Sequence, residues 1–168
     1  MAVSAIPVHD VAVCRPLLEQ AAVVRPGDLL LEDRGFIDGA TLSELKRTRR
    51  VEVIIPLKAN RLAAQDAMPL AEMADTWDVH PSRAEQRIAW VHGVEHRWPE
   101  CAVPLHACVI RFWKKKKKRT DHLVLVTTDL QRNASWIVRH SAERPEIEQD
   151  YGQRKSGGWQ RKRLSATR

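Results

Sequence analysis

The sequence predicts an α/β protein, and three observations support this fold class. Residues 26–58 follow a turn–strand–helix–strand pattern, residues 107–128 hold two apolar runs, and residues 129–155 carry a helical pattern. A chain of 168 residues with 43% hydrophobic and 29% charged residues has the ordinary composition of a globular domain with its own core. We therefore expect strands and helices to alternate along the chain.

The first third of the chain holds the clearest elements. A helix is expected to begin near Pro16, after which apolar residues recur at helical spacing. Pro26-Gly27 marks a turn, and the apolar run in residues 28–32 predicts a buried strand. Two leucines at helical spacing predict a helix over residues 41–50, and residues 51–57 form a second apolar strand.

The last third is expected to contain a long hairpin followed by helices. Residues 107–113 and 122–128 read as strands, and the segment KKKKKRT between them reads as the connecting loop. Residues 129–155 read as helical, with Pro145 in the first turn of the last helix, where its missing N–H leaves no hydrogen bond unmade.

Two carboxylates are candidates for chemistry. Asp33 follows the strand expected over residues 28–32, at the end where open α/β sheets bind ligands. Glu148 comes four residues after Arg144 and seven before Lys155, so a rotation of about 100° per residue puts the three on one helical stripe. A carboxylate between two cations suits a metal-binding acid that meets a phosphate backbone. Two simpler interpretations stay open: Asp33 as a helix cap, and Arg144 with Glu148 as a surface ion pair.

Several blocks of the sequence follow one another in a characteristic order: VHD at 8–10, GDLLLEDRGF at 27–36, VEVIIPLK at 51–58, LVLVTTDL at 123–130 and RPEIEQDYGQRK at 144–155. In this order the chain resembles the DDE transposases of bacterial insertion sequences of group four. The signature of that family spaces Tyr, Arg, Glu and Lys with two, three and six intervening residues. Arg144, Glu148 and Lys155 match the spacing, whereas Ser141 stands at the Tyr position.

The resemblance implies both a fold and a chemistry. The fold is a partial ribonuclease H-like core, a mixed sheet with flanking helices, with a β-containing insertion before the C-terminal Glu helix. By resemblance, Asp33 and Glu148 are catalytic and bind two divalent metal ions, Mg²⁺ with Mn²⁺ as a substitute, for an in-line displacement at phosphorus. Arg144 and Lys155 would bind DNA phosphates beside the scissile bond.

The resemblance also implies how the chain is organised. The expected regions are a partial core at 1–58, an insertion with a basic hairpin at 59–121, the final strand and Glu-bearing helices at 122–156, and a basic mobile tail at 157–168. The family's first metal-binding Asp lies upstream of the matched blocks, and Asp10 matches a different position. We therefore expect a fragment, shortened at both ends, that does not cleave DNA alone. Its strand at 28–32 would present an unpaired edge.

Composition limits the partners and the compartment. The net charge of +7 and the pI near 9.7 favour a polyanionic partner. The sequence has no apolar run of about 18 residues and no secretion signal, and its three cysteines do not indicate a disulfide framework. We expect a cytoplasmic protein that binds DNA, both transposon ends and target, as a homodimer in a synaptic complex and without a membrane.

One run of six consecutive cations is a candidate DNA contact: Lys114, Lys115, Lys116, Lys117, Lys118 and Arg119. If all six bound phosphates, affinity would fall with salt at a log–log slope near −5, from about 0.9 per contact. The alternative is a solvated loop. We favour DNA contact, because the family's insertion lies over the bound DNA end. Four tryptophans are candidates either for stacking on a displaced base or for the core: Trp77, Trp90, Trp98 and Trp113.

Two further metal hypotheses concern residues 92–108. His92, Glu95 and His96 match the HxxEH pattern of inverted zinc peptidases, but Gly93 and Pro99 leave little helix to carry it. A structural zinc site would instead use His92, His96, Cys101, His106 and Cys108. The two cysteines are spaced more widely than in usual zinc knuckles, and this hypothesis stays open.

The sequence therefore predicts the C-terminal half of a cut-and-paste transposase. In the intact enzyme, metal-dependent hydrolysis would nick the transposon ends and strand transfer would join them to target DNA. Two alternatives remain: a remnant that only binds DNA or an intact transposase, and a product without function.

Overall fold

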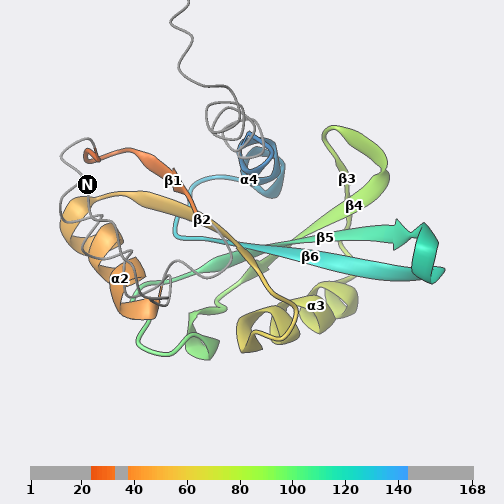
Figure 1. The fold of residues 1–168 in the computed structure, drawn as a ribbon, viewed down its shortest axis with the longest axis horizontal. Coiled ribbons are helices and arrows are strands. Elements are labelled where there is room, and N and C mark those ends of the chain that lie inside the picture. The colour runs from red at the N-terminus through yellow and green to blue at the C-terminus, as the bar shows by residue number, and fades with distance from the viewer. Residues whose placement is uncertain (1–23, 33–37, 144–168) are drawn as a thin grey trace, which may run out of the picture.

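A computed structural model describes residues 24–32 and 38–143, which form a six-stranded mixed sheet with helices on both faces (Figure 1). The strands are β1 (Leu29–Leu31), β2 (Glu52–Leu57), β3 (Asp78–His80), β4 (Arg83–His92), β5 (His106–Lys114) and β6 (Arg119–Thr127). The α-helices are α2 (Gly39–Glu44), α3 (Leu62–Ala74) and α4 (Ala134–Ser141). The strand order is β1-β2-β6-β5-β4-β3, with β1 and β2 parallel and every other pair antiparallel. The α/β fold class is confirmed, as a sheet and helices consistent with a partial ribonuclease H-like core.

The strands predicted over residues 28–32 and 51–57 are confirmed as β1 and β2. Their pairing joins Leu29 to Glu52 and Leu31 to Ile54, and the N–H of Glu32 continues the ladder by donating to the carbonyl of Ile54 at 3.0 Å. Within the described residues, β1 pairs with β2 alone and forms an edge of the sheet.

The helix predicted over residues 41–50 begins two residues earlier than expected. The side chain of Asp38 caps it by accepting a hydrogen bond from the N–H of Thr41 at 2.7 Å. After α2 the chain continues as a π-helix over Leu45–Arg49 and stops at Arg50, whose φ of 56° is left-handed. Gly39 is required at the helix start, because a Cβ there would lie 2.1 Å from the carbonyl oxygen of Pro99.

The predicted hairpin is confirmed as an antiparallel ribbon of β5 and β6, which we call the ribbon. Its register runs from His106 opposite Thr127 to Lys114 opposite Arg119. The expected seven-residue loop is too long, because Lys114 ends β5 and Arg119 begins β6. Only four lysines connect the strands, as a short 3-10 turn over Lys115–Lys117 and then Lys118, whose φ is 46°.

The prediction of helix throughout residues 129–155 is correct only for α4 within the part of the chain that the structure describes. Asp129 instead forms a turn, in which its carboxylate accepts from the N–H of Gln131 at 3.1 Å. The side chain of Asn133 then caps α4 by accepting from the N–H of Trp136 at 2.9 Å. Residues 144–155, with Pro145, and the helix expected near Pro16 lie outside the described residues.

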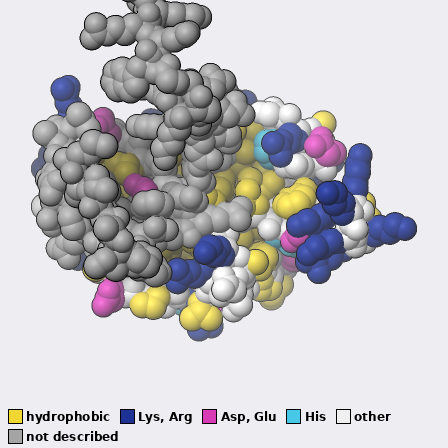
Figure 2. Space-filling model, viewed as in Figure 1, with side chains coloured by type: hydrophobic (Ala, Val, Ile, Leu, Met, Phe, Trp, Pro, Cys, Tyr) yellow, Lys and Arg dark blue, Asp and Glu magenta, His cyan; other side chains and the backbone are white. Residues whose placement is uncertain are grey.

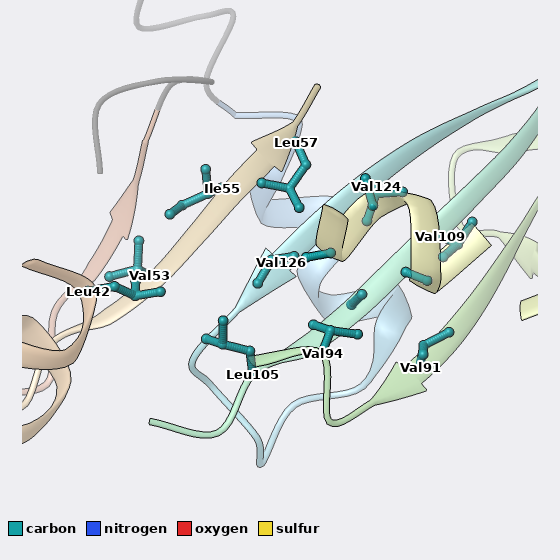
Figure 3. Packing of buried hydrophobic residues seen from close by; sticks show 14 of the residues in the cluster. Leu42, Val53, Ile55, Leu57, Val91, Val94, Leu105, Val109, Val124 and Val126 are labelled. Carbon is teal, nitrogen blue, oxygen red and sulfur yellow. The ribbon is translucent and has the colours of Figure 1, made fainter. Parts of the chain in front are cut away.

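The two faces of the sheet have separate cores. Helices α2 and α3 cover one face, and part of this core is shown in Figure 3, with labelled side chains Leu42, Val53, Ile55, Leu57, Val91, Val94, Leu105, Val109, Val124 and Val126. Helix α4 covers the other face, where its Ile137 and Val138 pack with Ile54, Cys108 and Leu125. Side chains alternate between the faces along each strand, so both sides of the ribbon near its start are buried.

The region expected as an insertion is continuous with the rest of the sheet. It contains α3, β3 and β4, none of which was predicted from the sequence. Strand β6 crosses the expected region boundary at residues 121/122. No helix in the described ranges is long and apolar enough to cross a membrane.

Candidate nucleic-acid interface

The four residues expected beside the scissile phosphate lie outside the described residues. These are Asp33, Arg144, Glu148 and Lys155. The described segments that lead to the two acids can be compared. Strand β1 stays extended up to Glu32, the residue before Asp33. Helix α4 ends at Ser141, seven residues before Glu148.

These two leading segments meet on the same face of the sheet. Leu29 and Leu31 of β1 pack against the cluster that contains Ile137 and Val138 of α4. Leu30, which points the other way, packs against the opposite cluster. The described segments that precede the two candidate acids therefore share the α4 face of the sheet.

The inverted-peptidase interpretation of residues 92–96 is wrong. His92 ends strand β4, whereas Glu95 and His96 lie in a 3-10 turn, so no helix presents the three side chains together. Glu95 accepts a hydrogen bond from the N–H of Leu105 at 3.1 Å, and His96 Nδ1 lies 2.9 Å from the carbonyl oxygen of Gly93. Glu95 thus closes the turn between β4 and β5.

The five-residue zinc hypothesis is not supported either, because the described residues contain no group of three or more potential ligands that could hold a metal ion. Cys108 lies under α4, and burial raises the pKa of its thiol to about 12. Burial also raises the pKa of Cys101, whose Sγ lies 3.4 Å from the carbonyl oxygen of Val103. Of the five candidates, only His92 and His106 touch, at 3.0 Å between ring nitrogens.

The six predicted DNA-binding cations lie together at the end of the ribbon, and we call them the basic tip: Lys114, Lys115, Lys116, Lys117, Lys118 and Arg119. Figure 2 shows Lys and Arg side chains gathered at this end of the molecule. Lys115 to Lys118 are exposed and form no ion pair with any described residue. Like charges this close repel each other, so a polyanion is the partner that relieves the repulsion.

The two outer cations of the basic tip are already engaged by Asp121, a residue that sequence reasoning missed. The carboxylate lies 3.3 Å from Lys114 Nζ and 3.9 Å from the Arg119 guanidinium. The backbone N–H of His122 and then these cations hold the pKa of Asp121 below its usual range. The contact follows from the register of the ribbon. Lys114 pairs with Arg119 and Phe112 pairs with Asp121, so all four side chains lie on one face of the ribbon.

The tryptophans divide between core and surface. Trp77 and Trp98 pack against the core under α2 and α3, and Trp90 packs against the core under α4. The Arg111 guanidinium lies 4.0 Å from the centroid of the Trp77 ring. Trp113 is 58% exposed and sits on β5 directly before the basic tip. Among the four candidates for base stacking, Trp113 is the one whose ring faces solvent.

Comparison with known proteins identifies the family. The chain matches the family described as Transposase DDE domain over residues 2–168. No curated protein and no solved structure matches it significantly. The match spans the parallel β1–β2 pair, the ribbon and α4, and it implies DNA as the partner and divalent metal ions as the usual cofactors. The chain belongs to the transposase DDE domain family, and DNA transposition is the function this membership supports.

Proposed function

We propose that the chain carries two of the metal-binding carboxylates of a transposase, Asp33 and Glu148, and that its basic tip binds DNA. The reaction is phosphodiester hydrolysis at transposon ends followed by strand transfer into target DNA, in a homodimeric synaptic complex. The observation that carries the proposal is an exposed run of lysines on a rigid ribbon, in a chain of the transposase DDE domain family.

Support for the two acids comes from the face on which their neighbours lie. Residues two apart on an extended strand point to the same side. Asp33 follows Leu31 by two positions, and Leu31 packs on the α4 face. Glu148 follows α4, the helix on that face. We therefore propose a shared site on the α4 face near the carboxyl end of β1, the end at which α/β sheets bind ligands.

Each side chain has a definite task in this proposal. Asp33 and Glu148 supply hard carboxylate oxygens of the kind that Mg²⁺ prefers. Bound divalent metal would activate the attacking oxygen and stabilise the leaving one. On the helical stripe expected from their spacing, Arg144 and Lys155 would flank Glu148, and their charges would hold the phosphates beside the scissile bond.

The ribbon carries the basic tip away from the end at which β6 pairs with β2. Nine residue pairs join β5 to β6, and at about 3.4 Å per residue the ribbon is roughly 30 Å long. Its inner half is buried between the α3 and α4 faces. DNA held at the carboxylates could then extend along the ribbon toward Lys115–Lys118.

Metal binding by the full chain tests the two acids. In Mn²⁺ titrations followed by electron paramagnetic resonance, Asp33→Asn and Glu148→Gln should each weaken binding about tenfold or more. The matched controls Asp75→Asn and Glu85→Gln replace exposed carboxylates elsewhere and should bind Mn²⁺ like the original chain. If the first two variants bind Mn²⁺ as tightly as the controls, the assignment of Asp33 and Glu148 is wrong.

A second candidate function is binding to DNA or to an intact transposase without cleavage, and the same basic tip favours it. Incubation with transposon-end DNA and Mg²⁺ or Mn²⁺ separates the two candidates. End-specific nicks would establish catalysis by this chain. A salt-dependent gel shift without nicks, which is the expected result for the chain alone, would establish binding only.

A further inference from the structure

We infer that His92 and His106 form a second metal site, selective for divalent transition metals rather than Mg²⁺. The pair lies at the junction of β4 and β5, away from the basic tip, and its imidazoles are chemically unlike the carboxylates of the proposed catalytic centre. The inference does not depend on the proposed function.

The distance between the two rings fits a shared metal ion. His92 Nδ1 and His106 Nε2 are 3.0 Å apart in a hydrogen bond, with the ring planes at 82°. One of the two nitrogens carries the proton of this bond, and a metal would take the place of that proton as it moves to the other nitrogen of its own ring or to solvent. Imidazole nitrogens bind Zn²⁺ at about 2.0–2.1 Å, and two such ligands at an angle of about 90° are separated by about 3.0 Å. Angles near 90° are the preference of tetragonal Cu²⁺ and Ni²⁺. The pair therefore offers the spacing of two neighbouring ligands without moving the backbone.

The backbone that carries the pair is fixed on both sides. His92 and His106 are direct partners in the β4–β5 register. Just beyond them, the N–H groups of Gly93 and Val94 both donate to the carbonyl of Leu105, at 3.1 and 3.2 Å. The carboxylate of Glu95 accepts from the N–H of the same residue. A metal would thus bind two ligands whose backbone is already held in place, which lowers the entropy lost on binding.

The rings themselves are restrained but accessible. Trp90 lies edge-on to both imidazoles, with ring centroids 6.3 Å from His92 and 5.4 Å from His106. His92 is exposed, which gives an ion a route to the pair. His106 Nδ1 is buried without a hydrogen-bond partner, so no second bond fixes its tautomer and Nε2 can present a lone pair to a metal.

Imidazole ligands also determine which ions bind. Neutral nitrogen donors bind Ni²⁺, Cu²⁺ and Zn²⁺ well and bind hard Mg²⁺ poorly, and affinity rises from Mn²⁺ to Cu²⁺ along the first-row series. Two protein ligands leave the remaining positions to solvent. The site would join β4 to β5 at the base of the ribbon.

Isothermal titration of the full, tag-free chain with Ni²⁺ tests this inference. We expect one Ni²⁺ site that persists in excess Mg²⁺, and His92→Ala should weaken it about tenfold or more. His96→Ala is the matched control, because its ring nitrogens are directed to the carbonyl of Gly93 and to Asp66 instead. It should leave Ni²⁺ binding unchanged.

His106 is partly buried, so its substitution can also change stability, and we therefore test it by the change in melting temperature that Ni²⁺ causes in each variant. Ni²⁺ should raise the melting temperature of the original chain and of His96→Ala, but of neither His92→Ala nor His106→Ala. Absence of Ni²⁺ binding, or full retention of the site in His92→Ala, would overturn the inference. Asp33→Asn should keep the Ni²⁺ site, so failure here and failure of the proposed catalytic centre are distinguishable.

Discussion

The two ends of the ribbon are built from the same two strands, but the side chains are buried at one end and charged and exposed at the other. At its base, residues 106–110 pair with 123–127, and the side chains of both faces enter a core. At its tip, residues 114–119 are all cations, and Lys115 to Arg119 are exposed. The base holds its position by excluding water, whereas the tip keeps its charges in water. The base therefore fixes where the tip points, and Lys115 to Lys118 stay exposed to a binding partner.

Two titrating groups show the same contrast. At the base, burial raises the pKa of Cys108 to about 12, since the thiolate would lose its hydration. Near the tip, a backbone N–H and neighbouring cations lower the pKa of Asp121. Burial determines the first shift, and hydrogen bonding with charge determines the second. Substitutions at the base should therefore change stability, and substitutions at the tip should change DNA binding.

A substitution at the base of the ribbon should cost the most stability. Leu125→Ala removes a side chain that is 2% exposed and packs under α4, so it should lower the free energy of unfolding by about 2–5 kcal/mol in urea titrations. Leu70→Ala makes the same change on α3, where the leucine is 44% exposed, and should change stability by less than about 0.5 kcal/mol. Equal losses in the two variants would show that the base is not a core.

The next effect is at the tip. Replacing Lys115, Lys116, Lys117 and Lys118 by Gln should flatten the log–log salt dependence of duplex binding by about 3.6, from about 0.9 per phosphate contact. Stability should not fall, because none of the four packs in the core. The control replaces four exposed cations elsewhere, Arg25, Arg50, Lys58 and Arg61, and removes the same net charge. If both variants lose the same slope, the tip has no special role in binding DNA.

Much of this comparison could be read from the sequence, and the rest could not. The strands at 28–32, 51–57, 107–113 and 122–128 were predictable because each is a local apolar run. The cations at 114–119 were equally visible. The length of the connecting turn could not be predicted, because it depends on how far the hydrogen-bonded ladder between the two strands continues. The same holds for Asp121 and for the His92–His106 pair, which come together through register rather than proximity in sequence.

Other differences have a local cause. Residues 129–133 carry a helical pattern, but the side chains of Asp129 and Asn133 bond to nearby backbone N–H groups and delay the helix start. Helix α3 was missed because its buried face is made of small alanines, which give a weak hydrophobic pattern. The predicted acids Asp33 and Glu148 stay predictions, since they lie outside the described residues.

A smaller effect should follow from releasing the two engaged cations. Asp121→Asn removes the negative charge between Lys114 and Arg119. If both then reach phosphates, the salt slope should become steeper by up to about 1.8, with tighter binding at low salt. Glu85→Gln, an exposed carboxylate on β4, controls for the change in net charge. An Asp121→Asn slope equal to that of the control would mean that Asp121 does not restrain the tip.

The smallest effect is the pH dependence of the same contact. Because folding lowers the pKa of Asp121, its ionised form stabilises the folded state above the unfolded pKa near 3.8, and this contribution is lost as the pH falls through the folded pKa. Exposed ion pairs contribute less than about 1 kcal/mol. In urea titrations, the original chain should therefore exceed Asp121→Asn slightly in stability at pH 7, and the difference should vanish in acid. Asn keeps an oxygen that can accept from the N–H of His122, so the difference reports the charge. A difference that stayed constant across this pH range would mean that it does not come from the ionised carboxylate, and would contradict this account of Asp121.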